Sequence, residues 1–399
     1  ALSPEALAAA YLELGDRYRD AIAQGNTTLE VLSTAIQAYE RGLQWSDDEF
    51  SSVSNVLNDL GNFYWMRSRH WQELQPALSD LEQALQYYQE AIARLDEAES
   101  SRSQYAQIQN NLGAAYGDLA RYSDSTTNLQ RSVEAYEEAL RYRPRELAPS
   151  KYGSTQNNLG TAYWHLAQQQ NPTQNLRAAI AAYQEALAQY HPETESMQWA
   201  MIQSNLGTAY WNLAQQEEPE RWLPRAIECY SASLRYRTAD SAPAACAATQ
   251  NNLGTAYWHL SFSDTLEPEQ QQGYLQHAIA AYSVASAIAE ELSLKNPPVF
   301  VNFDLVAAYN NLGAIHAQIA TNEAFDLPPT VRDEHLEASL HAHLKAFSFA
   351  TPQADSYTMS FNGIVATVRL FYQTGGAAAQ NRALSLIPAR ILPSIMERL

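Results

Sequence analysis

Apolar and polar positions in this chain recur with helical spacing. In residues 157–166, Leu159, Gly160 and Tyr163 fall on one face of an α-helix. A second segment follows at residues 179–187, where small or apolar side chains recur at offsets of three, four and seven. Neither segment alternates with period two, so strands are not expected, and clusters of proline and polar residues separate the segments. The pattern therefore predicts pairs of antiparallel helices.

The same pair of segments recurs along the chain and is marked by a glycine in the first segment. These glycines are Gly15, Gly61, Gly113, Gly160, Gly207, Gly254 and Gly313, with a degraded copy at Gly363. Subtraction gives spacings of 46, 52, 47, 47, 47, 59 and 50 residues. A period in this range indicates a repeat array rather than one globular core. We predict an all-α fold, an α–α superhelical solenoid of about eight antiparallel helix pairs.

The recurring glycine needs a physical reason, because glycine in a helix interior costs about 1 kcal/mol relative to alanine. We expect a small residue of the second helix, such as Ala179 or Ala186, to face Gly160. Tyr163 and Tyr183 would then fill the space beside this contact.

The motif resembles the tetratricopeptide repeat, which has Leu-Gly-x-x-Tyr in its first helix and Ala-x3-aromatic-x2-Ala in its second. The matching residues of the fourth copy are Leu159, Gly160, Tyr163, Ala179, Tyr183 and Ala186. The usual period of that family is about 34 residues, and the longer repeats here resemble those of kinesin light chain. The resemblance implies a right-handed superhelix whose first helices line a concave groove.

Regularity along the chain predicts two regions. Residues 1–350 form the solenoid, with the first copy as a cap because Asp16 and Arg17 follow its glycine, and with copies two to seven after it. Residues 351–399 match the motif poorly, and we expect them to form a degenerate final repeat or a C-terminal helical cap.

Composition narrows the class of partner. The 399 residues include 44 acidic and 25 basic side chains, for a net charge of −19, so nucleic acid is not expected as a partner. Cys229 and Cys246 give no disulfide framework, and no apolar run reaches the ~18 residues of a membrane span. We expect a cytoplasmic protein, monomeric or weakly dimeric. The periplasm or a membrane surface is the alternative if a leader or anchor was removed before Ala1.

Polar and aromatic residues occupy the other side of the first helix. Helical spacing places Asn157, Thr161 and Trp164 on one stripe and Asn158 and His165 on the next, away from the motif leucine. Equivalent positions in other copies form ladders. The expected partner-binding residues are Trp65, Asn110, Asn111, Asn157, Asn158, Thr161, Trp164, His165, Asn205, Thr208, Trp211, Asn251, Asn252, Thr255, Trp258, His259, Asn310 and Asn311.

The family resemblance assigns a role to part of this set. In peptide-binding members, the asparagine before the motif leucine contacts the peptide, which here implies Asn111, Asn158, Asn205, Asn252 and Asn311. Two structural alternatives stay open. The asparagines could bond only to the next first helix, and the tryptophans could pack between neighbouring repeats.

No motif for catalysis is present. The sequence has no glycine-rich phosphate loop, no Gly-x-Ser-x-Gly and no His-Glu-x-x-His, and His341 and His343 are too close in sequence to share a helix face. We therefore predict no enzyme activity, no metal and no cofactor.

We predict a non-catalytic scaffold or adaptor that binds an extended peptide or protein segment in its groove. The resemblance to bacterial, including cyanobacterial, members implies a factor for assembling a larger complex. The alternative is a ligand-sensing regulatory module that controls an effector outside this segment.

Overall fold

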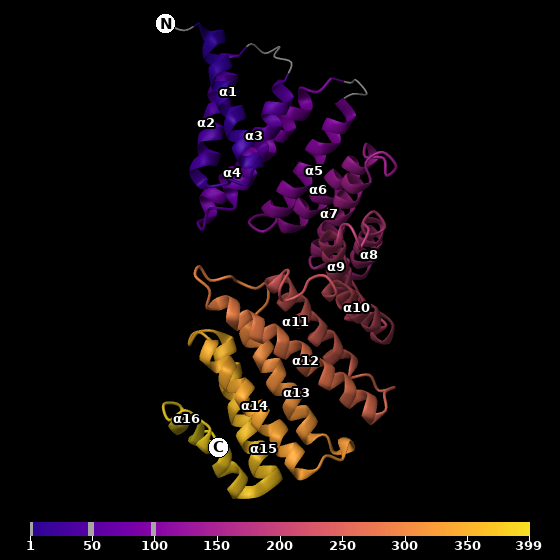
Figure 1. The fold of residues 1–399 in the computed structure, drawn as a ribbon, viewed down its shortest axis with the longest axis vertical. Coiled ribbons are helices and arrows are strands. Elements are labelled where there is room, and N and C mark those ends of the chain that lie inside the picture. Colours follow the sequence, from indigo (N-terminus) through magenta and orange to yellow (C-terminus); the bar gives the residue numbers. More distant parts are fainter. Residues whose placement is uncertain (1–2, 47–51, 97–100) are drawn as a thin grey trace. The chain divides into compact units, whose positions relative to one another are not determined.

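The computed structural model describes residues 3–46, 52–96 and 101–399, and within these ranges it contains sixteen α-helices and no strand (Figure 1). The predicted all-α class is confirmed, and consecutive helices pack against each other in pairs as in tetratricopeptide-like solenoids. The chain divides into two compact units, Ala1–Tyr190 and His191–Leu399.

Unit 1 consists of four helix pairs. Their first helices are α1, α3, α5 and α7, and their second helices are α2, α4, α6 and α8. In chain order the bounds are α1 Pro4–Ala23, α2 Leu29–Trp45, α3 Val53–Ser68, α4 Leu74–Ala93, α5 Arg102–Leu119, α6 Ser125–Arg141, α7 Pro149–Ala167 and α8 Pro172–Leu187. Neighbouring pairs touch through α2 and α3, α4 and α5, and α6 and α7. The first helices α3, α5 and α7 also contact one another in sequence.

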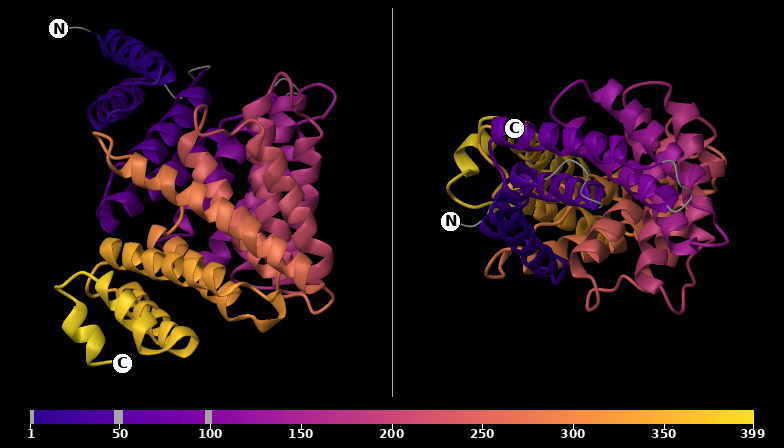
Figure 2. Two further views of the ribbon diagram at one scale, coloured as in Figure 1. Left: turned by 60° about the horizontal axis from the view of Figure 1, so that its bottom comes forward. Right: turned by 90° about the horizontal axis from the view of Figure 1, so that it is seen from above.

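Unit 2 also alternates first and second helices, and α12, α14 and α15 are its longest. Its bounds are α9 Ser196–Ala214, α10 Pro219–Leu234, α11 Pro243–Leu260, α12 Pro268–Ser293, α13 Leu305–Thr321, the 3-10 turn η2 Glu323–Phe325, α14 Pro329–Phe349, α15 Asp355–Ser385 and α16 Leu392–Met396. Helices α13, α14 and α15 pack against one another, and their orange-to-yellow ribbons can be followed in the left view of Figure 2. A backbone kink at Gly376, with φ of 69°, divides α15 into two helical parts.

Helix starts follow from local chemistry. Seven of the described α-helices begin with a proline, which favours the first turn of a helix. These prolines are Pro4, Pro149, Pro172, Pro219, Pro243, Pro268 and Pro329. In the turns between the helices of pairs three, four and five, the residue before the second helix adopts a left-handed conformation. These residues are Asp124, Asn171 and Glu218. Aspartate and asparagine tolerate this conformation better than most residues, so the first two turns match their sequence.

An aromatic ring of the second helix lies on the recurring glycine of the first. A Cβ atom at Gly160 would approach Cδ1 of Tyr183 to 2.8 Å. The rings in this position are Tyr39, Tyr88, Tyr136, Tyr183, Tyr230 and Tyr282, and His343 replaces them over Gly313 and Gly363. The ring, rather than the side chain of Ala179 or Ala186, is therefore what faces the glycine. Glycine is required at this position, because its hydrogen side chain leaves room for the ring.

The hydroxyl of this buried tyrosine is usually held by the residue after the glycine. Tyr88 donates to Asn62 at 2.8 Å, and Tyr39 donates to Asp16 at 2.8 Å. A buried hydroxyl without a partner would lose its hydration without compensation, so the hydrogen bond makes the ring position specific. Tyr136 of α6 is an exception, because Ala114 follows Gly113 and offers no side-chain acceptor.

Candidate functional site

The predicted site residues lie on the first helices α3, α5, α7, α9, α11 and α13. Most are half-buried, whereas His165 is exposed and Asn310 is buried at 6% exposure. Their hydrogen bonds divide them into residues that join helices and residues that line a cavity.

The three threonines join the two helices of a pair. Each hydroxyl lies within hydrogen-bond distance of the tyrosine hydroxyl over the preceding glycine: Thr161 and Tyr183 at 3.0 Å, Thr208 and Tyr230 at 3.1 Å, and Thr255 and Tyr282 at 2.7 Å. Thr161 also lines the cavity described below. The other two threonines make their described contacts inside their own pairs.

The inner ladder is the asparagine position directly before the motif leucine, namely Asn111, Asn158, Asn205, Asn252 and Asn311. Two of these residues reach back to the preceding pair. Asn111 donates to Oδ1 of Asn58 at 3.1 Å and to Oδ1 of Asn62 at 3.0 Å, and both acceptors lie on α3. Asn311 donates to the hydroxyl of Tyr282 on α12 at 3.2 Å. These two amides stabilise the stacking of successive pairs.

Asn158 differs from these two. Asn158 makes no hydrogen bond to another described residue, and its side chain lines the cavity. Asn205 and Asn252 are half-buried on α9 and α11, and Asn252 accepts a long hydrogen bond of 3.5 Å from Asn251.

The outer ladder is the position one residue earlier, namely Asn110, Asn157, Asn251 and Asn310. Two of these residues bond toward the following pair. Asn110 accepts from the Thr155 hydroxyl of α7 at 3.1 Å. Asn310 donates to Ser360 of α15 at 2.9 Å and faces Nδ1 of His343 at 3.1 Å. Asn157 is half-buried on α7. Asn110 and Asn310 therefore link one first helix to a later one, whereas Asn251 bonds to Asn252 within α11.

The tryptophans also contact the next first helix. Nε1 of Trp65 donates to Asp118 of α5 at 2.9 Å, and Nε1 of Trp258 donates to Gln318 of α13 at 3.0 Å. The acceptors occupy equivalent positions, five residues after Gly113 and Gly313. His259 holds that position after Gly254, and its ring centroid lies 5.5 Å from that of Trp211. The tryptophan contacts thus join neighbouring pairs.

Trp164 and Trp211 differ from the other two tryptophans in their polar contacts. Their Nε1 atoms are buried and have no hydrogen-bond partner within the described ranges. The ring centroid of Trp164 lies 4.7 Å from that of His165 in an edge arrangement.

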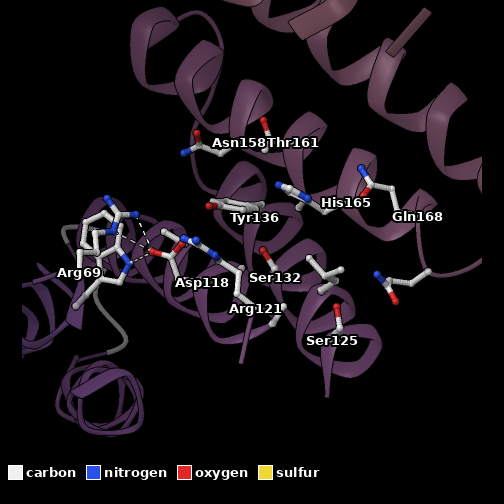
Figure 3. A pocket seen from close by; sticks show the side chains of 17 residues that line it. Arg69, Asp118, Arg121, Ser125, Ser132, Tyr136, Asn158, Thr161, His165 and Gln168 are labelled. Atoms are coloured by element: carbon white, nitrogen blue, oxygen red, sulfur yellow. Dashed lines mark hydrogen bonds and ion pairs between the residues drawn. The ribbon is translucent and has the colours of Figure 1, made fainter. Parts of the chain in front are cut away.

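A cavity of about 660 Å³ lies among α3, α5, α6 and α7 of unit 1 (Figure 3). Four predicted site residues line it, namely Trp65, Asn158, Thr161 and His165. Tyr136, Leu129 and Ala162 supply buried wall, whereas Arg121, His165, Gln168 and Gln169 are exposed at its mouth. Its volume lies in the range of about 300–1,000 Å³ that is typical of ligand sites.

Small residues of α5 create this cavity. Gly117 stands four residues after Gly113, where α3, α7, α9 and α11 carry tryptophan. Ala114 stands where Asn62 and Thr161 lie in the adjacent pairs. The missing indole leaves space beside α7, and the missing polar side chain leaves the Tyr136 hydroxyl without a hydrogen bond to any described residue.

Two arginines and one carboxylate set the charge of the cavity. Asp118 accepts from Nη2 of Arg69 at 2.7 Å, and the Arg69 guanidinium lies 4.0 Å from the centre of the Trp65 ring. Arg121 is exposed at the mouth and has no ion pair with a described residue. The cavity therefore has a local excess of positive charge in an acidic chain.

Two titratable side chains of the cavity are kept neutral. Loss of water around the imidazole, and then the positive charge of Arg121, lower the pKa of His165 below its usual value. Burial, and then the negative charge of Asp118, raise the pKa of Tyr136. At neutral pH His165 therefore offers an acceptor nitrogen, and Tyr136 offers a hydroxyl donor.

Sequence reasoning identified four of the lining residues and missed the others, among them Arg69, Arg121, Tyr136 and Gln168. The signal for them was the interruption of the tryptophan ladder at Gly117. A gap in a packed ladder marks the neighbours of the absent side chain as candidate ligand contacts.

Groups of acidic, histidine and cysteine side chains suited to hold a metal ion are absent from the described ranges. Within the same ranges, no helix has the length and apolar character needed to cross a membrane.

Comparison with known proteins gives one family match. Residues 106–141, which fall within α5 and α6, match a family model described as tetratricopeptide repeat. No curated protein matches the chain.

Several solved structures are similar to this chain at low sequence identity. A tetratricopeptide repeat protein from Parabacteroides merdae is 13% identical, with 88% of this chain and 99% of that chain covered and a TM-score of 0.45. A Rap protein complexed with competence and sporulation factor is 14% identical, with 98% of each chain covered and a TM-score of 0.41.

A further similar structure is a signal transduction ATPase from Pyrococcus horikoshii with a tetratricopeptide repeat sensor. It is 13% identical, with 93% of this chain and 53% of that chain covered and a TM-score of 0.46. The tetratricopeptide repeat model matches the third helix pair of this chain, over residues 106–141.

Proposed function

We propose that this chain is a non-catalytic scaffold that binds an extended segment of a partner protein on the first helices of unit 1. The observation that carries the proposal is the cavity, where Asn158, Thr161 and His165 lie beside Arg121 and Gln168, and where the Asn158 side chain has no hydrogen bond to another described residue. The other predicted residues would contribute mainly by holding the helices that form this face.

The polar groups at the cavity suit a polypeptide main chain. An extended segment presents alternating carbonyl acceptors and N–H donors, so its binding site needs groups of both kinds. The amides of Asn158, Gln168 and Gln169 provide both, whereas Tyr136 and Arg121 donate. These groups lose little on binding, because they give up contacts with water rather than hydrogen bonds that hold the fold.

We also propose the organisation in which this face is displayed. Residues 1–350 would act as the solenoid and residues 351–399 as its C-terminal cap. The partner would belong to a larger complex that the chain helps to assemble, as the likeness to longer bacterial repeats suggests.

Selection from a phage-displayed library of random peptides, with the purified full chain as bait, tests the proposal. We expect enriched peptides that bind the unaltered chain and lose at least about tenfold in affinity, or about 1.4 kcal/mol, for the double variant Asn158→Ala and His165→Ala.

Ser154→Ala is the matched control, because Ser154 is exposed on the same helix and does not line the cavity. This variant should bind as the unaltered chain does. Absence of any enriched peptide, or equal binding to the double variant, would refute the proposal.

A further inference from the structure

The neighbourhood of Trp65 provides a template for the cavity. Three elements surround this indole: Arg69, which lies over the ring at 4.0 Å; Asp118, which accepts from Nε1 at 2.9 Å; and the packed walls of α3 and α5. Arg69 stands eight residues after Gly61, and Asp118 stands five residues after Gly113.

The same positions one pair later are occupied, but the indole is missing. Arg121 stands eight residues after Gly113, and His165 stands five residues after Gly160. Both line the cavity, and Gly117 lies where the tryptophan would be. The chain therefore keeps the cation and the acceptor that surround an indole, and leaves the place of the ring open.

We propose that this cavity binds a small planar aromatic molecule with an N–H group, of the indole class, at the place vacated by tryptophan in α5. The N–H would donate to His165, and the Arg121 guanidinium would lie over the ring, as Arg69 lies over Trp65. This inference goes beyond the scaffold function and does not depend on it.

The chemistry of the walls favours this ligand over others. Ala114, Gly117 and Ala162 present little bulk, and Leu129 presents an apolar surface, so a flat apolar ring fits the interior. A cation would be repelled by Arg121. Arg121 attracts the negative face of an aromatic ring through a cation–π contact, and a neutral histidine acceptor satisfies the single polar hydrogen of an indole.

Occupancy would also link helices. The guest would touch α5 and α7 together, and so supply the contact between pairs three and four that Trp65 supplies between pairs two and three. A ligand that binds only the folded state stabilises it by an amount that grows with the logarithm of its concentration above the dissociation constant, so binding should stiffen this part of unit 1.

The test uses 5-fluoroindole as the probe, because fluorine NMR reports the guest independently of the 8 tryptophans of the chain. We expect binding to the full chain and to the control Ser154→Ala, because Ser154 is exposed on α7 and does not line the cavity. Gly117→Trp should lose at least about tenfold in affinity, because its own side chain fills the place.

Gly117→Trp should keep its helicity and show an equal or higher thermal midpoint, since four other first helices carry tryptophan at this position. If Gly117→Trp does not fold, Gly117→Leu fills part of the same space and should also weaken binding. Undiminished binding of 5-fluoroindole to either folded variant would overturn the proposal.

Three further probes define the ligand class. Naphthalene lacks the N–H, so it should bind more weakly than indole, and His165→Phe should remove the difference. Benzoate should bind more weakly than indole. A blocked tryptophan amide should bind no tighter than indole. Reversal of any of these orders would overturn the assignment to a free indole-type molecule.

The two proposals fail separately. If selected peptides depend on Asn158 and His165 while 5-fluoroindole does not bind, the scaffold proposal stands and the indole site is wrong. If 5-fluoroindole binding is lost in Gly117→Trp while no peptide is enriched, the indole site is supported and the scaffold proposal is wrong.

Discussion

Two glycines in the same helix should respond in opposite ways to alanine. Gly113 and Gly117 lie one turn apart on α5, so an alanine at either site gains the same helix propensity of about 1 kcal/mol. Their surroundings differ. A Cβ at residue 113 would lie 2.8 Å from three ring atoms of Tyr136, whereas a Cβ at residue 117 would meet one hydroxyl oxygen at 3.5 Å.

The distances decide the sign of each change. Carbon atoms pack best at about 3.5–4.0 Å, so the ring of Tyr136 must move by several tenths of an ångström to admit alanine at residue 113. Tyr136 is 5% exposed and packs in the core, and such overpacking costs about 1–3 kcal/mol. Gly113→Ala should therefore lower the free energy of unfolding by up to about 2 kcal/mol, whereas Gly117→Ala should raise it by about 0.5–1 kcal/mol.

Urea denaturation followed by far-ultraviolet circular dichroism measures both variants against the unaltered chain. Because repeat arrays often unfold in more than one step, hydrogen exchange of α5 and α6 amides should accompany it and localise the effect. Equal stability of the two variants, or greater stability of Gly113→Ala, would refute the packing of the ring on the glycine.

Three other predictions concern the contacts between pairs and the buried titratable groups. Trp258→Phe should lower stability by about 1 kcal/mol more than Trp211→Phe in urea denaturation, because only Trp258 loses a described hydrogen bond; equal losses would contradict the role given to Gln318. Burial lowers the pKa of His343 to about 4 from an ordinary value near 6.5. The contribution of neutral His343 to the free energy of unfolding is therefore intact above about pH 6.5 and falls by up to about 3 kcal/mol as the pH drops toward 4. Thermal midpoints and NMR titration of the imidazole check this, and protonation near pH 6.5 would contradict it. Burial raises the pKa of the Cys229 thiol to about 12, so it should resist iodoacetamide at pH 8 until the chain unfolds, and rapid labelling of the folded chain would contradict its burial.

Helical periodicity was sufficient to predict the helix pairs. The first helix of the fourth copy was expected around its Leu-Gly-x-x-Tyr motif, and α7 covers Pro149–Ala167. Such local signals are strong because each turn of a helix repeats the choice between buried and exposed positions. The partner of Gly160 was predicted less well, because spacing shows which residues share a face but not which of them reaches farthest across it.

The site was harder to predict than the fold for a geometric reason. Helical spacing predicts Trp65 and Trp258 away from the motif leucine, but that side of the helix meets both solvent and the next first helix. Which of the two a side chain contacts depends on the angle between successive pairs. That angle arises from many contacts together, and no single residue of the motif encodes it.

The contact between tyrosine and glycine lies wholly inside one helix pair. Tyr183, Gly160 and Thr161 satisfy one another without help from neighbouring pairs. Gene duplication or deletion can therefore add or remove a pair without disturbing this contact in any other pair. The tryptophan contact behaves differently, because the donor and the acceptor belong to successive pairs. A change in the order of the pairs would separate Trp65 from Asp118. The tyrosine–glycine contact therefore permits the array to gain pairs, whereas the tryptophan contact constrains their order.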